Sequence, residues 1–176
     1  MARDPPVDFK IISDANTEYI ELINSANEIS SCFSEIITNY ARWDEQGRLH
    51  IKAYQDEAHP HDCKHCPVNL CKGKEFKAIL TRKKYEHVIY IGDGHGDYCP
   101  CLHLQRYYTI NITIKAFIAD LYSISSDAIL ARKDWALHKA IIKSTEPVNA
   151  PVFTWQDGAE MSQHLERLVV SYSIEH

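Results

Sequence analysis

The chain has 176 residues and a formal net charge of −5, and it is long enough for one domain with a buried core. The negative charge gives nucleic-acid binding no electrostatic support, so we expect no nucleic-acid partner. No apolar run has the length of a secretion signal or of a membrane span. Because six cysteines occur without a secretion signal, we expect a reducing, cytoplasmic environment and no membrane contact.

Apolar β-branched runs alternate with amphipathic runs along the chain, and this alternation predicts an α/β sheet. The expected strands cover residues 9–14, 34–41, 48–55, 87–92 and 127–130, with a last one near Val152 and Phe153, and the expected helices cover residues 17–27, 72–86, 134–143 and 157–170. Segment 42–48 is typical of a β-hairpin turn with Gly47 in the left-handed conformation. A loop rich in cysteine and histidine is expected at residues 56–70.

Two parts of a phosphate site stand at the ends of expected elements in the first half of the chain. The first strand ends in Ser13 and Asp14, and Lys72 begins the helix expected at residues 72–86. A hydroxyl donor and a fixed cation are groups that bind phosphate oxygens.

A third part follows the strand expected at residues 87–92. That strand ends in a Gly-Asp-Gly sequence containing Asp93, and a second carboxylate, Asp97, comes four residues later. In open α/β folds the carboxyl ends of the strands form the ligand-binding edge of the sheet. Paired carboxylates at such an edge suit a hard cation, most often Mg²⁺ that acts on a phosphate. A polar turn after a strand is the alternative interpretation of this motif.

Several segments resemble the eukaryotic phosphoethanolamine/phosphocholine phosphatases and the related pyridoxal-phosphate phosphatases of the haloacid dehalogenase-like superfamily. These segments are residues 12–16, 61–72, 90–94, 99–100 and 131–133. The resemblance implies a three-layer α/β/α sheet with a β-hairpin. It also implies a Mg²⁺-dependent hydrolase of a small phosphomonoester, either phosphoethanolamine or phosphocholine, or pyridoxal 5′-phosphate. The oligomeric state stays open.

The resemblance also implies roles for individual residues. Asp93 would hold Mg²⁺, and Asp97 would order the loop or reach the metal through water. Lys72 would neutralise charge on the nucleophile and on the phosphoryl oxygens, with Lys74 as the alternative. Ser13 would donate a hydrogen bond to the phosphate, and its neighbour Asp14 is grouped with the substrate-binding residues.

The chain departs from the family pattern in several places, one of which is Gly96, where the family usually has Asn before the second Asp of the metal loop. Family members carry Asp-x-Asp-x-Thr on a first strand, where the first Asp is the nucleophile, and no Asp-x-Asp occurs in these 176 residues. We therefore interpret residues 1–176 as one partial domain, truncated at its N-terminus, without the nucleophile strand and the cap, and inactive alone. A non-catalytic pseudo-phosphatase or a gene-model fragment is the alternative. Residues from about 105 to 122 are interpreted as an insertion, either a translated intron or a surface loop.

The loop at residues 56–70 raises a separate hypothesis. Cys63 and Cys66 have the spacing of a zinc knuckle, and Cys99, Cys101 or His103 could supply further ligands. The alternative is a set of reduced cysteines that pack a loop near the active site. A zinc-loop interaction module is therefore a third functional hypothesis, beside the phosphatase and the non-catalytic remnant.

Overall fold

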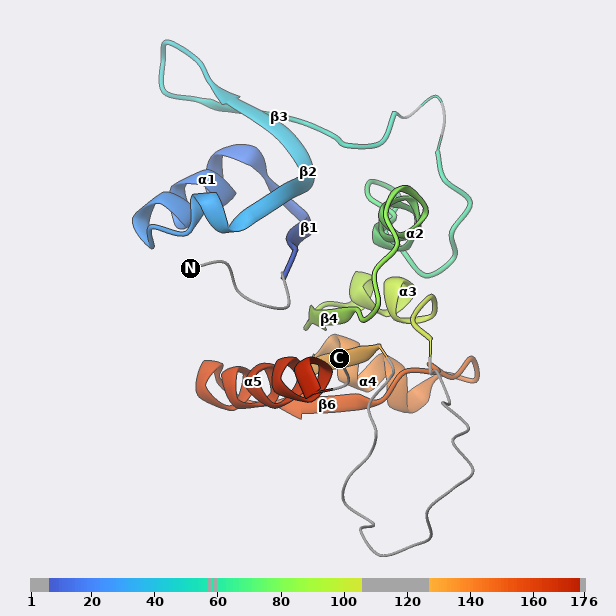
Figure 1. Ribbon diagram of the computed structural model, residues 1–176. Helices are drawn as coiled ribbons and strands as arrows, with labels where there is room; N and C mark the ends of the chain where they lie inside the picture. The colour runs from blue at the N-terminus through green and yellow to red at the C-terminus, as the bar shows by residue number, and fades with distance from the viewer. Residues whose placement is uncertain (1–6, 57, 59, 106–126, 175–176) are drawn as a thin grey trace, which may run out of the picture. The chain divides into compact units, whose positions relative to one another are not determined.

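The computed structural model describes residues 7–56, 58, 60–105 and 127–174. The chain forms two compact units, Met1–Ile79 and Leu80–His176, and each of them contains one three-stranded sheet (Figure 1). The alternation of strands and helices confirms the expected α/β class. The single-domain organisation stays a prediction.

The first unit is built around a parallel pair of strands joined by a helix. Its elements are β1 (Phe9–Asn16), α1 (Thr17–Ala26), the short 3₁₀ helix η1 (Ser30–Cys32), β2 (Phe33–Trp43) and β3 (Leu49–Lys52), and the helix α2 (Lys72–Arg82) begins in this unit. Asn16 ends β1 and starts α1, because its side chain accepts a hydrogen bond from the Tyr19 N–H at 3.0 Å. Ile20 of α1 and Ile37 of β2 are buried in the core of this unit.

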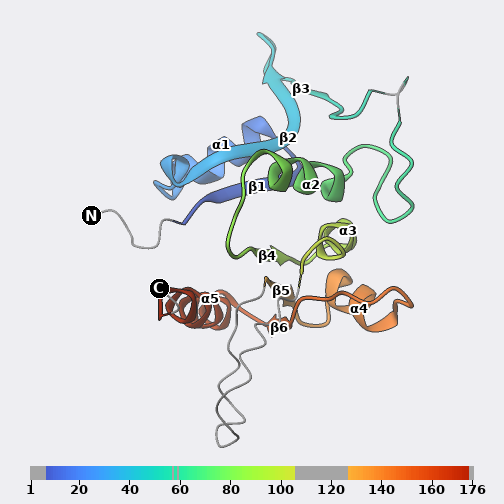
Figure 2. The same ribbon diagram turned by 45° about the vertical axis from the view of Figure 1, so that its right-hand side comes forward.

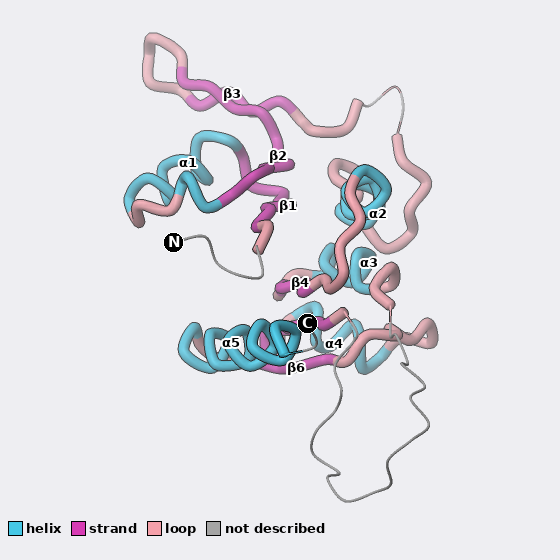
Figure 3. Tube along the Cα trace, viewed as in Figure 1, coloured by secondary structure: helices cyan, strands magenta, loops and turns pink. Residues whose placement is uncertain are grey.

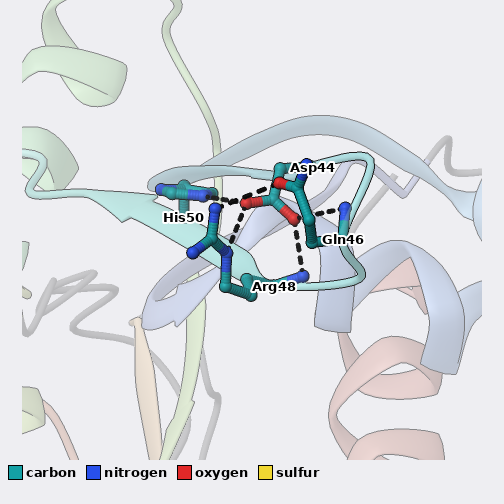
Figure 4. A network of polar contacts seen from close by, with 4 residues as sticks. All are labelled: Asp44, Gln46, Arg48 and His50. Atoms are coloured by element: carbon teal, nitrogen blue, oxygen red, sulfur yellow. Dashed lines mark hydrogen bonds and ion pairs between the residues drawn. The ribbon is translucent and has the colours of Figure 1, made fainter.

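The antiparallel hairpin of β2 and β3 is closed by Asp44 (Figure 4). Its carboxylate accepts hydrogen bonds from the N–H groups of Gln46 at 3.0 Å and Arg48 at 2.8 Å. The same carboxylate lies 2.8 Å from Arg48 Nε and 2.7 Å from His50 Nε2. The pKa of Asp44 lies well below its usual range. The hydrogen bond with His50 is the largest cause, and the hydrogen bond from the Arg48 N–H is the next largest. Gly47 has a φ of 73°, which confirms the left-handed glycine expected at this turn.

The second unit is a parallel sheet whose central strand is buried on both faces. Its elements are β4 (Ile89–Gly92), η2 (His95–Asp97), α3 (Tyr98–Cys101), β5 (Ala128–Arg132), α4 (Ala136–Lys143), β6 (Val152–Trp155) and α5 (Gly158–Ile174). The strand order is β4-β5-β6, and α4 and α5 lie on opposite faces of the sheet (Figure 2). Ala128 and Leu130 pack with Leu168 and Tyr172 of α5, while Ile129 on the alternate face is also fully buried. Each large apolar side chain buried in this way stabilises the fold by about 1.5–3 kcal/mol.

Four strands lie at the ends of the two sheets, and β1 and β4 are two of them. β1 ends the order β1-β2-β3, and β4 ends the order β4-β5-β6. Each of these strands therefore has one edge that no described strand pairs. Such an edge exposes a row of backbone donors and acceptors, which are able to pair with a further strand.

The structure adjusts some of the expected boundaries. α2 ends at Arg82 rather than at residue 86, because the Val88 N–H is bound to the Asp127 carboxylate at 3.0 Å and the backbone leaves the helix to reach that position. The loop between β3 and α2 contains no helix or strand among its described residues, as expected (Figure 3). The expected insertion at 105–122 lies outside the described residues except for Gln105. Among the helices that the structure describes, none is long and apolar enough to cross a membrane.

Candidate functional site

The loop after β4 is organised by the buried carboxylate of Asp97. Asp97 Oδ2 accepts hydrogen bonds from the N–H groups of Asp93 at 3.1 Å and Gly94 at 2.8 Å. The Tyr90 hydroxyl donates to the other oxygen, Oδ1, at 3.0 Å. Asp97 is 5% exposed, so these bonds replace its contacts with water. Both of its oxygens are therefore occupied in ordering the loop.

Gly92 makes this arrangement possible, because Asp97 packs directly against it. A Cβ atom added at Gly92 would lie 2.7 Å from both Cβ and Cγ of Asp97, which is closer than real atoms approach. Any larger residue at this position would displace the carboxylate from the N–H groups that it binds. The glycine that the sequence places before Asp93 is thus required by close packing rather than by an unusual φ.

Asp93 has a different environment from Asp97. Its side chain is 46% exposed, and its Oδ2 lies 3.7 Å from Nη1 of Arg132, which ends the neighbouring strand β5. The Asp93 carbonyl accepts the Leu137 N–H at 3.0 Å, and this bond ties the loop to the start of α4. The Asp93 carboxylate is thus held at the carboxyl edge of the parallel sheet with solvent access, where it is able to coordinate a cation.

Arg132 brings a positive charge and two aromatic rings to the same edge. Its guanidinium carbon lies 3.9 Å from the ring centre of Trp135 and 5.4 Å from that of Trp155. Its Nε is buried without a hydrogen-bond partner among the described residues. A guanidinium that packs on aromatic rings is restricted in orientation, and guanidinium groups are able to bind anions.

Lys72 lies at the start of its helix as predicted, whereas β1 extends to Asn16, so Ser13 and Asp14 lie inside the strand rather than at its last residue. Ser13 is half-buried near the end of β1, and its Oγ accepts the Ala15 N–H at 3.1 Å, which leaves the hydroxyl proton able to donate. Asp14 is exposed, and its carbonyl accepts a bond from Asn39 Nδ2 at 2.9 Å. Lys72 is the first residue of α2.

The sequence-predicted residues thus divide between the two units. Ser13, Asp14 and Lys72 belong to the first unit, and Asp93 and Asp97 belong to the second. Within the second unit the structure brings Asp93 and Asp97 into one hydrogen-bonded loop. That all five act in one site stays a prediction.

Sequence reasoning missed two side chains in the second unit. The sequence places Tyr90 in a strand, but its hydrogen bond to Asp97 depends on which face of β4 it occupies. Arg132 lay in a segment that resembles the family but received no role. Its position at the end of the strand adjacent to β4 is the signal that could have found it, because the ends of neighbouring parallel strands meet at one edge.

Comparison with known proteins places the chain in a family. Residues 1–169 match the family Put_Phosphatase, described as "Putative Phosphatase". The chain belongs to this family. It is 36% identical over 167 residues to inorganic pyrophosphatase 2 of Arabidopsis thaliana, an alignment that covers 92% of this chain and 53% of that protein. No solved structure matches the chain.

Two further relatives carry phosphatase names. The chain is 33% identical over 173 residues to a thiamine phosphate phosphatase-like protein of Arabidopsis thaliana, covering 96% of this chain and 63% of that protein. It is 29% identical over 167 residues to pyridoxal phosphate phosphatase PHOSPHO2 of Mus musculus, covering 90% of this chain and 60% of that protein. The chain therefore spans between half and two thirds of the length of these relatives. These matches confirm the resemblance stated from the sequence.

Proposed function

We propose that this chain supplies the phosphate-binding and metal-binding part of a Mg²⁺-dependent hydrolase of small phosphomonoesters. The observation that carries the proposal is the loop after β4, in which the Asp97 carboxylate binds two backbone N–H groups. This arrangement leaves the Asp93 carboxylate exposed at the sheet edge. Membership in a family described as a phosphatase supports phosphate chemistry at that edge.

The donor set of the loop fits Mg²⁺. This ion prefers oxygen ligands, and proteins hold it through one or two carboxylates together with waters and substrate phosphate. Asp93 would be the direct ligand, because its carboxylate is exposed while both oxygens of Asp97 already accept hydrogen bonds. When bound, the ion would neutralise charge on the phosphate oxygens. Asp97 would act by holding the loop in the geometry that presents Asp93.

The remaining phosphate contacts are proposed from the family resemblance. Ser13 would donate its hydroxyl proton to a phosphate oxygen, with Asp14 beside it. Lys72 would place its ammonium at the N-terminus of α2, where the helix dipole also favours an anion. Arg132 is a further candidate, since its stacked guanidinium lies beside Asp93.

The nucleophile is proposed to come from outside these residues, because no Asp-x-Asp occurs in the sequence. In the superfamily that the chain resembles, the strand with the nucleophile lies beside the strands that end at Ser13 and Asp93. β1 and β4 each have an edge that no described strand pairs, and a further strand is able to pair with an edge of this kind. On this proposal the 176 residues are inactive alone and only marginally stable. A non-catalytic protein is the competing outcome.

The first experiment tests catalysis. The 176-residue chain is assayed with an aryl phosphate and Mg²⁺, and no turnover is expected. A longer form that carries an in-frame Asp-x-Asp segment upstream is then assayed with Asp93→Asn and with the control Asp157→Asn. The control removes a charge at the start of α5 but keeps a good capping residue.

We expect Asp93→Asn to lose at least about 10²–10³-fold in turnover, the range for one electrostatic contact at a reacting group. The control should keep its activity. Undiminished Mg²⁺-dependent turnover in Asp93→Asn would remove Asp93 from the site. An inactive longer form would favour the non-catalytic protein.

The second experiment tests the substrate. The names of the relatives offer pyridoxal phosphate, thiamine phosphate and pyrophosphate, and the sequence resemblance adds phosphoethanolamine and phosphocholine. A panel of these compounds on the longer form should show one small phosphate compound preferred over phosphoproteins and nucleotides. Faster hydrolysis of a phosphoprotein or a nucleotide would contradict the proposed substrate class.

A further inference from the structure

Three cysteines meet in the loop between β3 and the start of α2. The Sγ atoms of Cys63, Cys66 and Cys71 lie within 4.8 Å of one another. They belong to a single stretch of the first unit with the spacing Cys-x₂-Cys-x₄-Cys. None of the six cysteines, all of which lie among the described residues, forms a disulfide. The cluster is therefore a set of sulfur donors rather than a cross-link.

We propose that Cys63, Cys66 and Cys71 hold a structural zinc ion. Zinc binds thiolates at about 2.3 Å in tetrahedral geometry, which places neighbouring sulfurs about 3.8 Å apart. The observed separations, none above 4.8 Å, require only a small contraction. The sequence indicated the pair Cys63 and Cys66, and the fold adds Cys71 from the edge of α2. This site lies outside the proposed phosphatase chemistry and does not depend on it.

The loop is long and has no regular secondary structure among its described residues. Between Lys52 and Lys72 the described residues form no helix or strand. Long stretches of this kind are uncommon inside compact domains unless a function or a cross-link accounts for them. A metal that joins three points of the loop would be a cross-link of this kind, because its binding free energy becomes folding free energy.

His61 supports the placement of the loop and is excluded as a ligand. Its Nε2 lies 2.7 Å from the Pro67 carbonyl oxygen, and its Nδ1 accepts the Cys63 N–H at 3.3 Å. A single neutral tautomer satisfies both bonds, with the proton on Nε2. Both ring nitrogens are thus used to hold Cys63 in the turn, so the cluster is a thiolate site.

Cys71 is held in a fixed position at the start of α2. It directly precedes α2, and its Sγ accepts the Lys74 N–H at 3.4 Å. This sulfur is thus an acceptor whose position is fixed relative to the helix. Cys101 provides the contrast within the second unit, because its thiol donates to the Asp97 carbonyl at 3.1 Å and burial raises its pKa. That cysteine therefore stays protonated.

The test uses the full 176-residue chain produced with zinc and dialysed against buffer. We expect about one zinc per chain by elemental analysis, as one closed site requires. Replacement by Co²⁺ should give the sulfur-to-metal absorption and visible bands of a tetrahedral thiolate site. Cys63→Ser, Cys66→Ser and Cys71→Ser should each lower zinc affinity by more than about 100-fold, the upper range for loss of a supporting residue alone. Cys32→Ser, in the same unit but exposed and outside the loop, should bind zinc like the parent.

A second measurement uses only the parent chain, so its result does not depend on whether the cysteine variants fold. The parent chain is alkylated with and without zinc, and the modified cysteines are mapped by mass spectrometry. Zinc should protect Cys63, Cys66 and Cys71 while Cys32 reacts in both samples. The same map tests Cys99 and Cys101, which the sequence offers as further ligands beside His103. Absence of bound zinc, equal protection of Cys32, or a cobalt spectrum without sulfur bands would overturn the proposal.

Discussion

Gln105 and Asp127 are joined by two hydrogen bonds across a long interval of sequence. The Gln105 N–H donates to the Asp127 carboxylate at 2.8 Å, and the Asp127 N–H donates to the Gln105 carbonyl at 3.2 Å. The other carboxylate oxygen of Asp127 accepts the Val88 N–H at 3.0 Å. The chain thus leaves this point of the second unit at Gln105 and returns to it at Asp127.

This pairing predicts that residues 106–126 are dispensable for folding. The two ends are already in contact, so a short Gly-Ser turn is able to connect Gln105 to Asp127. We expect the shortened chain to keep a cooperative thermal transition within a few degrees of the parent by circular dichroism. Asp127→Ala is the comparison, since it removes two acceptors and should lower the transition clearly. Loss of cooperative melting in the deletion alone would show that these residues belong to the fold.

Asp127 also predicts a specific dependence of stability on pH. Burial raises the pKa of its carboxyl, against the opposing effect of the Gln105 and Val88 N–H groups. A carboxyl whose pKa is higher in the folded state costs stability once it ionises. This cost disappears as pH falls through the folded pKa towards the unfolded value of about 3.9.

The check is a comparison of urea unfolding between the parent and Asp127→Asn at pH 7 and at successively lower pH. The parent should gain stability relative to the variant as pH falls, because only the parent has the titrating group. A difference that is constant with pH would show that Asp127 does not titrate differently in the folded state.

Gly92 should tolerate no side chain, whereas Gly158 should tolerate one. Gly92→Ala would bring a Cβ to 2.7 Å from Asp97, while a Cβ at Gly158 meets nothing within 4 Å. We expect Gly92→Ala to destabilise by about 1–3 kcal/mol, the range for overpacking. Gly158→Ala, at the start of α5, should be neutral or stabilising by up to about 1 kcal/mol. Chemical denaturation of the two variants measures both, and equal effects would show that the contact with Asp97 has relaxed.

The three hydrogen bonds that the Asp97 carboxylate accepts predict a graded loss of stability in a series of variants. Tyr90→Phe removes one hydrogen bond and leaves the two loop N–H groups paired, so a loss of about 1 kcal/mol is expected. Asp97→Asn keeps a carbonyl oxygen for the loop and should cost less than Asp97→Ala. Asp97→Ala leaves the N–H groups of Asp93 and Gly94 unsatisfied and should cost roughly 2–4 kcal/mol.

Unfolding free energies of these variants, together with the double variant Tyr90→Phe/Asp97→Ala, measure the coupling. The Tyr90 substitution should have little further effect once Asp97 is absent, because its partner has gone. Fully additive effects would mean that the hydroxyl contact contributes nothing to the stability of the loop.

The sequence by itself determined the order and type of the elements. Buried strands such as Ala128–Arg132 are continuous apolar runs, and Gly47 after a polar pair specifies a hairpin turn, so local patterns carry this information. The sequence also placed Asp93 at a strand end, since the apolar run stops one residue before it. The family followed from short motifs, and the comparison confirmed it.

Only the tertiary structure decided which role each candidate site residue is able to have. From the sequence, Asp97 could equally order the loop or reach a metal, and the three hydrogen bonds that occupy its oxygens favour the first role. Likewise, Arg132 lies beside Asp93 because β4 and β5 are neighbours in the sheet. Cys71 lies near Cys63 because of the path of a loop that has no regular secondary structure. Such relationships join residues that are distant in sequence, and no local periodicity encodes them, because they arise from packing and hydrogen bonding after the elements have formed.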